Sequence, residues 1–283
     1  MKILITGTNG QVGHALIQQL TEHELIGLTR KDCDLTKPDQ IRQVIDQYQP
    51  DLIINPAAYT KVDQAEDEHE LAFLINRDAP KVMAEKAREY DIPFIHFSTD
   101  YVFDGEKRGG YKEDDPTNPL GVYGQSKLAG EQAIQNIGGQ FYILRTSWVF
   151  SNIGHNFFLT MKKLSQEREE LKVVADQIGV PTSNQFIAEQ IQNIIPQLNL
   201  NYSGVYHLVP DGFCSWYEFT KMIIKKTNSN FDLDNLHAVQ THEFPTKTQR
   251  PKNSCLQNHK VKQMFMLKFK DWQTELDKVI HEA

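Results

Sequence analysis

The sequence predicts an α/β protein, in which a doubly wound parallel sheet carries helices on both faces and is joined by a smaller mixed α/β domain. Short apolar runs alternate with stretches of helical periodicity along the 283-residue chain, a pattern typical of parallel strands joined by crossover helices. A turn with three glycines directly follows the first apolar run. The length suits one large domain or two modest ones, and 40% hydrophobic with 24% charged residues is a globular composition.

The first apolar run, 2–6, is short and continuous, as expected of a buried strand. The next stretch, 11–22, has apolar residues at helical spacing. By the same criteria further strands are predicted at 24–28, 51–58, 93–98, 140–147 and 171–176, and further helices near 38–48, 71–90 and 123–136. Because LKVVAD (171–176) and GVYHLV (204–209) look like sheet strands, the second half of the chain is expected to interleave with the first.

Charge and cysteine content argue against several classes of protein. The formal net charge is −7, whereas a nucleic-acid-binding protein usually carries a basic face, so no nucleic-acid partner is expected. The three cysteines lack a short pair spacing, which argues against a disulfide framework or a zinc site and suits a reducing cytosol. No apolar run approaches the roughly 18 residues of a membrane span, and no signal-like segment is evident. The expected protein is cytoplasmic, without a membrane partner or a bound metal.

The segment TGTNGQVG (6–13) places glycines between the first predicted strand and the first helix. Gly7 suits a tight turn, Gly10 lets the backbone approach a pyrophosphate, and Gly13 lets helix and strand pack closely. The helix N-terminus adds free N–H groups and a partial positive charge. The spacing is G-x-x-G-x-x-G rather than G-x-G-x-x-G, and an ordinary strand–helix turn stays the alternative. We predict a Rossmann-like dinucleotide-binding domain over 1–150 and a substrate domain built mainly from 151–283.

The end of the second predicted strand bears on which nicotinamide cofactor is bound. An NAD site commonly has an acidic residue there for the ribose 2′-hydroxyl, whereas an NADP site can use an arginine. Here the segment GLTRKDCDLT has Arg30 and Lys31 at this point and no acid at the strand tip. The sequence therefore favours NADPH, with NADH also accepted, although two solvated basic residues would give the same pattern.

Three polar residues form a candidate catalytic set. Tyr123 and Lys127, in YGQSK, are spaced i, i+4 on one face of the helix predicted for 123–136. Thr99 stands at the carboxyl end of a predicted strand. A free phenol titrates at about 10, and Lys127 or an oxidised nicotinamide nearby is expected to lower that value. For reduction of a ketone, Tyr123 would donate the proton to the carbonyl oxygen, and Thr99 would hydrogen-bond the same oxygen.

With these residues the sequence resembles the extended short-chain dehydrogenases/reductases, and within them the dTDP-4-dehydrorhamnose reductase family, over nearly its whole length. The motifs that carry the likeness are TGTNGQVG, CDLT, NPAAYTKVDQAE, FSTDYVFDG, RTSWVF, DQIGVPT, GVYHL and RPKNS. The resemblance implies reduction of the 4-keto group of dTDP-6-deoxy-L-lyxo-4-hexulose to dTDP-L-rhamnose. It also implies contacts with the cofactor in addition to those expected of Gly7, Gly13 and Arg30. The residues are Gly10, Gln11, Val12, Asp34, Leu35, Ala57, Ala58, Tyr59, Phe97, Tyr123 and Lys127.

The resemblance further implies that the sugar nucleotide contacts Thr99, Asp100, Tyr123, Trp148 and Arg250. An acidic protein that binds a diphosphate needs local cations, and arginine forks fit phosphate geometry. Two alternatives stay open, because Trp148 lies in an apolar run as a core aromatic would, and Arg250 could be a solvated turn residue. His96 and His207 also lie within apolar runs and are interpreted as structural side chains rather than ligands.

Other functions are weighed against this one. The sugar-nucleotide 4,6-dehydratases carry Thr-Asp-Glu where this chain has Tyr101 in the third place, so dehydration is disfavoured. A 4-epimerase would use the same tyrosine and lysine. The regulatory subunit of methionine adenosyltransferase also resembles this family, but the intact catalytic set favours an enzyme. Some family members are dimers bridged by Mg²⁺ through glutamates; His14 follows Gly13 here, so a homodimer stays open but a metal bridge is not expected.

Overall fold

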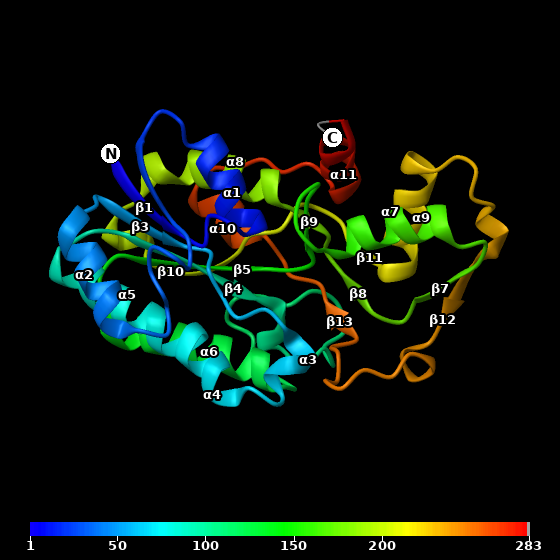
Figure 1. Ribbon diagram of the computed structural model, residues 1–283, viewed down its shortest axis with the longest axis horizontal. Helices are drawn as coiled ribbons and strands as arrows, with labels where there is room; N and C mark the ends of the chain where they lie inside the picture. The colour runs from blue at the N-terminus through cyan, green and yellow to red at the C-terminus, as the bar shows by residue number, and fades with distance from the viewer. Residues whose placement is uncertain (282–283) are drawn as a thin grey trace.

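The computed structural model describes residues 1–281 and has two lobes, one of which is built on a large parallel sheet (Figure 1). The six strands of this sheet are parallel and follow the order β10-β5-β4-β3-β1-β2. Their bounds are β1 (Lys2–Thr6), β2 (Glu24–Leu28), β3 (Leu52–Asn55), β4 (Phe94–Thr99), β5 (Phe141–Thr146) and β10 (Gly204–His207). The inner strands are buried along nearly their whole length, which is why the sequence shows them as continuous apolar runs.

Helices cover both faces of the sheet (Figure 1). One face carries α2 (Pro38–Tyr48), α5 (Ala79–Glu89) and α6 (Val122–Ile137), and the other carries α1 (Gln11–Gln19), α8 (Asn184–Ile194) and α10 (His259–Met264). Alternate residues of β1 divide between the two faces: Leu4 packs with α2 and α5, whereas Ile3 and Ile5 pack with α1 and α8. Between β3 and α5 lie α3 (Val62–Ala65), α4 (His69–Phe73) and a π-helical turn, η1 (Leu74–Asp78).

The second lobe has its own apolar core, to which α7 (Phe157–Glu167), α9 (Trp216–Thr227) and α11 (Trp272–His281) contribute. Its strands form three small sheets: β7 (Leu171–Val174) with β12 (Leu236–Val239), β8 (Ile178–Gly179) between β11 (Cys214–Ser215) and β13 (Asn253–Ser254), and β6 (Val149–Phe150) with β9 (Thr182–Ser183). Short 3-10 turns are η2 (Asp100–Val102), η3 (Ile195–Gln197), η4 (Leu200–Tyr202), η5 (Leu233–Asn235) and η6 (Thr241–Glu243). No helix within residues 1–281 is both long and apolar enough to cross a membrane.

The chain passes between the lobes more than once. After residue 150, α8 packs against α1, β10 adds to the edge of the large sheet beside β5, and α10 packs against β10. The strand predicted at 204–209 therefore belongs to the large sheet. The strand predicted at 171–176 is β7, which pairs with β12 in the second lobe and not with the large sheet. The functional division of the chain at residue 150 stays a prediction.

The strand order determines where a ligand can bind. The neighbours of β1 are β2 and β3, so the order of the strands reverses beside β1. In open parallel sheets a crevice forms at the carboxyl ends of the strands where the order reverses. The glycine turn after β1, the segment after β3 and Thr99 at the end of β4 all lie along this edge.

Candidate active site

The turn between β1 and α1 has the geometry of a dinucleotide-binding loop. Gly7 has a φ of 60°, in the left-handed region that favours glycine, and its carbonyl oxygen accepts a hydrogen bond from the Gly10 N–H (N···O 2.9 Å). A methyl group on Gly13 would lie 2.3 Å from that carbonyl oxygen, so α1 can approach this closely only with glycine. A methyl group on Gly10 would meet only the same oxygen, at 3.3 Å, and otherwise open space.

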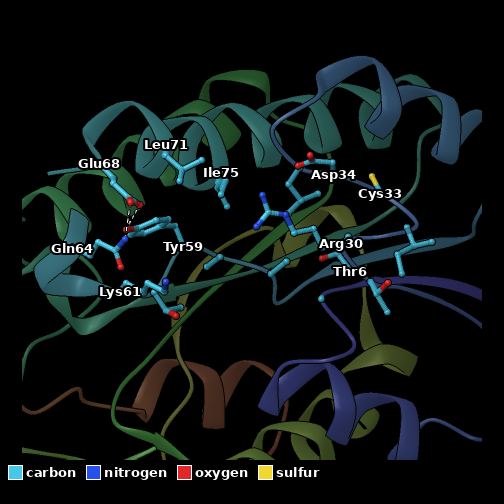
Figure 2. A pocket seen from close by; sticks show the side chains of 17 residues that line it. Thr6, Arg30, Cys33, Asp34, Tyr59, Lys61, Gln64, Glu68, Leu71 and Ile75 are labelled. Atoms are coloured by element: carbon cyan, nitrogen blue, oxygen red, sulfur yellow. Dashed lines mark hydrogen bonds between the residues drawn. The ribbon is translucent and has the colours of Figure 1, made fainter. Parts of the chain in front are cut away.

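A cavity extends along the carboxyl edge of the sheet in two adjoining parts. The first, of about 490 Å³, lies over the N-terminus of α1 and reaches Tyr123 and Lys127. The second, of about 450 Å³, lies over the end of β2 and is shown in Figure 2. Gly7, Ala57 and Ala58 line both parts. Gly10 is the N-cap of α1 and has no side chain to cover the first N–H groups, so the loop fits the diphosphate of a dinucleotide.

All of the predicted cofactor-contacting residues line one or the other part of this cavity. Their contacts with a cofactor stay a prediction. At the end of β2, the Arg30 guanidinium points into the second part of the cavity (Figure 2). Asp34 lies beside it, and hydrogen bonds from the Thr36 N–H and hydroxyl hold the pKa of its carboxyl below the usual value. An arginine that could hold a 2′-phosphate and a carboxylate that could hold a 2′-hydroxyl therefore share one wall.

Tyr59 forms the far wall of the same cavity and is held at both ends. Its hydroxyl donates to Glu68 Oε2 (2.7 Å; Figure 2) and its backbone N–H donates to Asn76 Oδ1 (2.8 Å). The Asn76 Nδ2 donates in turn to the Tyr59 carbonyl oxygen (3.0 Å) and to Ser126 Oγ on α6 (3.0 Å). Burial, followed by Glu68, raises the pKa of Tyr59 to about 12, so the phenol is neutral. Asn76 lies in the π-helical turn, which the sequence pattern does not reveal.

Tyr123, Lys127 and Thr99 come together beside the first part of the cavity. Tyr123 and Lys127 lie one turn apart near the start of α6 and both line the cavity. The Thr99 side chain lies within hydrogen-bonding reach of the Tyr123 hydroxyl and donates to Asp100 Oδ1 (3.0 Å). The helix packs closely against the η2 turn here: a methyl group on Gly124 would lie 2.2 Å from the carbonyl oxygen of Tyr101, which belongs to that turn.

The protonation of Tyr123 differs from the sequence expectation. Burial raises its pKa above the ordinary value, with Asp100 acting in the same direction and the hydrogen bond with Thr99 opposing. The prediction that Lys127 holds the phenol pKa low is therefore wrong for the protein alone, because burial raises this pKa and Lys127 is not among the groups that act on it. Burial also lowers the pKa of Lys127 to about 8, against the opposing effect of Glu131. Tyr123 is protonated at neutral pH, which is the state that a proton donor requires.

Asp100 is a buried carboxylate with an unused oxygen. The residue is 3% exposed, and burial raises its pKa to about 6, with hydrogen bonds from Ser254 and Thr99 opposing. Within residues 1–281, its Oδ2 has no hydrogen-bond partner. A buried acceptor of this kind is costly unless a ligand completes it, so the position suits a hydroxyl-bearing ligand next to Thr99. Among residues 1–281, no cluster of three or more His, Cys, Asp or Glu could hold a metal ion.

Trp148 and Arg250 have separate sets of contacts. Trp148 has a φ of 47° and stacks on Trp216 of α9, with ring centroids 3.5 Å apart and planes 10° apart. Arg250 donates from Nη2 to Asp63 Oδ2 (2.6 Å) and from Nη1 to the Tyr101 hydroxyl (3.2 Å). The ring of Tyr101 packs edge-on against Tyr123 (centroids 5.5 Å apart), so Arg250 is one side chain away from the catalytic set.

Sequence reasoning did not identify Asp63, Tyr101 or Trp216 as parts of this site. Each acts through a partner that lies far away in the sequence, so no local spacing could have indicated it. His96 was interpreted as structural, and the structure places its Nε2 3.2 Å from Lys127 Nζ. The available signal in the sequence was a histidine placed between apolar residues of this strand.

A doubly wound parallel sheet, a glycine loop where its strand order reverses, and a tyrosine–lysine pair facing the same cavity define a class: the nicotinamide-dependent short-chain dehydrogenases/reductases. A family model described as "RmlD substrate binding domain" matches residues 1–283, and the chain belongs to this family.

The chain is similar to proteins of this family over its whole length. It is 39% identical to the dTDP-4-dehydrorhamnose reductase of Aggregatibacter actinomycetemcomitans over 98% of both chains. It is also 39% identical to the Escherichia coli K12 protein of the same name, over 100% of this chain and 98% of that one. Among solved structures, Bacillus anthracis dTDP-4-dehydrorhamnose reductase in complex with NADP superposes with a TM-score of 0.94, 37% identity and coverage of 100% and 99%.

Proposed function

We propose that this chain is an enzyme that reduces the 4-keto group of dTDP-6-deoxy-L-lyxo-4-hexulose with NADPH, giving dTDP-L-rhamnose. Full-length relatives carry that activity in their names. The observation that carries the proposal is the meeting of the Tyr123 and Thr99 side chains beside a cavity that begins at the dinucleotide loop. A hydroxyl pair at this place can receive the oxygen of a bound ketone.

In this reaction the protein supplies the proton and holds the carbonyl group. Bound NADPH supplies the hydride that adds to the carbonyl carbon. Tyr123 donates its phenolic proton to the carbonyl oxygen, which becomes the new hydroxyl, and later regains a proton from solvent. The Thr99 hydroxyl, which donates to Asp100 Oδ1 in the protein alone, turns its proton to the same oxygen and fixes its orientation. Lys127 is a buried cation that lines the same cavity as the phenol and stabilises the negative charge that develops on Tyr123 as the proton leaves.

The cofactor is held by the groups that line the two parts of the cavity. The diphosphate lies against the glycine loop, at Gly7, Gly10, Gln11, Val12 and Gly13. The adenosine half lies over the end of β2, at Arg30, Asp34 and Leu35, with Ala57, Ala58 and Tyr59 along its path. Phe97 and Lys127 flank the nicotinamide end. Because Arg30 and Asp34 share one wall, NADPH is preferred and NADH is also accepted.

The sugar nucleotide lies between this cavity and the second lobe. The unused Oδ2 of Asp100 accepts a sugar hydroxyl. Arg250 uses two of its five N–H donors on Asp63 and Tyr101, and its remaining donors bind the diphosphate. Trp148, held by its stack on Trp216, forms the wall against the sugar and the base. The enzyme acts in the cytoplasm, which its three free and buried cysteines suit, and a homodimer is compatible with this function.

Three other functions have less support. A 4,6-dehydratase needs an additional acid–base group, and this chain has Tyr101 at that place, with its hydroxyl bonded to Arg250. A 4-epimerase would show no net consumption of NADPH. A purely regulatory subunit would need neither the Tyr123–Thr99 hydrogen bond nor the buried Lys127.

The test is a steady-state assay of the purified chain alone with the dTDP-4-keto sugar and NADPH, with the configuration at C4 read by NMR. We expect stoichiometric NADPH oxidation and the L-rhamnose configuration. Tyr123→Phe should lower kcat by roughly 10²- to 10⁴-fold, the usual effect of losing a general acid, with the NADPH Kd nearly unchanged. A Tyr123→Phe enzyme with near-normal kcat, or a wild type that consumes no NADPH, would sink the proposal.

A further inference from the structure

A chain of buried polar side chains crosses the sheet beneath the candidate catalytic lysine. The Thr6 hydroxyl lies 2.6 Å from Asn55 Oδ1, Asn55 Nδ2 lies 3.0 Å from His96 Nδ1, and His96 Nε2 lies 3.2 Å from Lys127 Nζ. The four residues come from β1, β3, β4 and α6, and none is more than 2% exposed. Four polar side chains in the apolar centre of a sheet need a reason, because burial of unpaired polar groups is costly.

The charge on Lys127 determines how this chain of hydrogen bonds is arranged. An ammonium group can only donate, so His96 must accept through Nε2 and carry its own proton on Nδ1. A proton on Nδ1 needs an acceptor, so the Asn55 amide, whose Nδ2 is placed toward Nδ1 and whose Oδ1 is placed toward Thr6, must be turned by 180°. Oxygen and nitrogen of an amide are assigned from the hydrogen-bond network; after the turn Asn55 Oδ1 accepts from Nδ1 and Nδ2 donates to the Thr6 hydroxyl. Burial and the charge of Lys127 keep the pKa of His96 well below its usual range, so the ring is neutral. Each of the four polar side chains then has a hydrogen-bond partner.

The arrangement also directs the ammonium group. Of the three N–H donors of Lys127, one goes to the Phe97 carbonyl oxygen (2.6 Å) and one to His96 Nε2. Both acceptors belong to β4, so they hold the ammonium from one side. The third N–H is left for the cavity that Lys127 lines.

We propose that His96 is a positioning residue of the reductase: its neutral ring presents Nε2 as an acceptor that keeps Lys127 charged and turns the third N–H of the ammonium toward the nicotinamide end of the cavity. The proposal rests on the proposed function for its kinetic consequences only. The tautomer that it requires is a property of the protein at rest.

Other charged groups around Lys127 do not replace this acceptor. Glu131 lies one turn later on α6 and favours the charged lysine, but both of its oxygens are taken by Arg145 of β5 (2.9 and 2.7 Å). Tyr123, one turn earlier, is neutral, and Asp100 after β4 acts on Tyr123 and not on Lys127. His96 and the Phe97 carbonyl are therefore the direct partners of the ammonium.

His207 provides an internal comparison. It is likewise a buried histidine near the end of a strand of the large sheet, with its Nδ1 3.1 Å from the Gln257 carbonyl oxygen. Its Nε2 has no partner within residues 1–281, and burial lowers its pKa to about 3. It contacts no member of the catalytic set, so a substitution there measures the general cost of changing a buried histidine.

The first measurement needs no catalysis. Nitrogen-15 NMR of the labelled wild-type protein, with the ring signals assigned by their loss in His96→Gln, should show a proton on Nδ1, an unprotonated Nε2 and no titration between pH 6 and 9. A proton on Nε2, or a ring that titrates near 6.5, would overturn the proposal even if the enzyme reduces the keto sugar as proposed. If the wild type is inactive while the Nδ1 tautomer is found, only the proposed function fails.

The second measurement is the pH profile of kcat/KM for three variants. Phenylalanine at position 96 removes the acceptor, asparagine retains a group only near the Nδ1 position, and glutamine can place its side-chain oxygen near the Nε2 position. Loss of one hydrogen bond to a charged group should move the high-pH limb about one to two pH units lower in His96→Phe and His96→Asn. At pH 8 kcat/KM should fall by roughly 5- to 50-fold, and at pH 6 by no more than about 2-fold.

The glutamine variant and the comparison histidine make the result specific. His96→Gln should recover most of the wild-type profile, and His207→Gln should leave the position of the high-pH limb unchanged. A loss that is equal at every pH, or a glutamine variant as impaired as the asparagine variant, would overturn the acceptor role. If His96→Phe does not fold, the comparison of His96→Gln with His96→Asn still tests the acceptor role.

Discussion

Glycines 10 and 13 of the cofactor loop are expected to fail in different ways when each is replaced by alanine. A methyl group on Gly13 would lie 2.3 Å from the Gly7 carbonyl oxygen, 2.8 Å from its carbonyl carbon and 2.9 Å from Thr8 Cα. All three are backbone atoms, so α1 itself must move away from β1. A methyl group on Gly10 would meet only one atom, at 3.3 Å. The backbone of Gly10, with a φ of −85° and a ψ of 166°, has a conformation that alanine adopts without strain.

The magnitudes follow from these contacts. Because the overlap at Gly13 is with backbone atoms, overpacking there costs the upper part of the usual range, about 2–3 kcal/mol, and the lower backbone entropy of the unfolded chain returns about 0.4–1 kcal/mol. For a chain of this size about 1 kcal/mol corresponds to about 2 °C, so the net loss of about 1–2.6 kcal/mol should lower the Tm of Gly13→Ala by about 2–5 °C. Gly10→Ala has the same entropic gain with little overlap, so its Tm should rise by about 1–2 °C. Its methyl group occupies the space proposed for the diphosphate, and the NADPH Kd should rise at least about tenfold.

Two assays on the same preparations separate the effects: thermal unfolding followed by circular dichroism without cofactor, and NADPH titration followed by fluorescence. The two variants serve as controls for each other, since both add one methyl group to the same loop. A Gly10→Ala protein that binds NADPH as the wild type does would show that the diphosphate lies elsewhere. A Gly13→Ala protein with unchanged Tm would refute the packing argument.

Three further substitutions test other parts of the site. Arg30→Ala should lower the preference for NADPH over NADH by up to about fivefold, since exposed charge pairs contribute little; an unchanged ratio of the two kcat/KM values would leave Arg30 a solvated residue. Arg250→Ala should lower kcat/KM for the sugar nucleotide by roughly 10- to 150-fold with the NADPH Kd unchanged, and the opposite pattern would assign this arginine to the cofactor. The folded-state pKa of Asp100, about 6, lies above its ordinary value of 3.8, so the native protein loses stability as pH rises through this window. Asp100→Asn should therefore raise the Tm at pH 7.5 but not at pH 4, while raising KM for the sugar; equal Tm gains at both pH values would contradict the pKa argument.

The sequence by itself determined the features that depend on neighbouring residues. The helix predicted for 123–136 is α6, Val122–Ile137, because apolar periodicity and the spacing of Tyr123 and Lys127 are local properties. The glycine loop was identified because Gly7 and Gly13 meet steric demands between adjacent elements. The cofactor-contacting residues line one cavity because parallel strands bring their carboxyl ends to the same edge.

Only the tertiary structure decided which side chains meet and how strongly burial acts on them. Arg250 and Asp63 are 187 positions apart, and no spacing rule links them. The strand at 171–176 was recognised, but its partner β12 depends on how the second lobe folds. The pKa of Tyr123 rises rather than falls, because desolvation depends on every atom packed around the phenol. His96 was visible in the sequence as one polar residue in an apolar strand, whereas its contact with Lys127 arises only when β4 packs against α6.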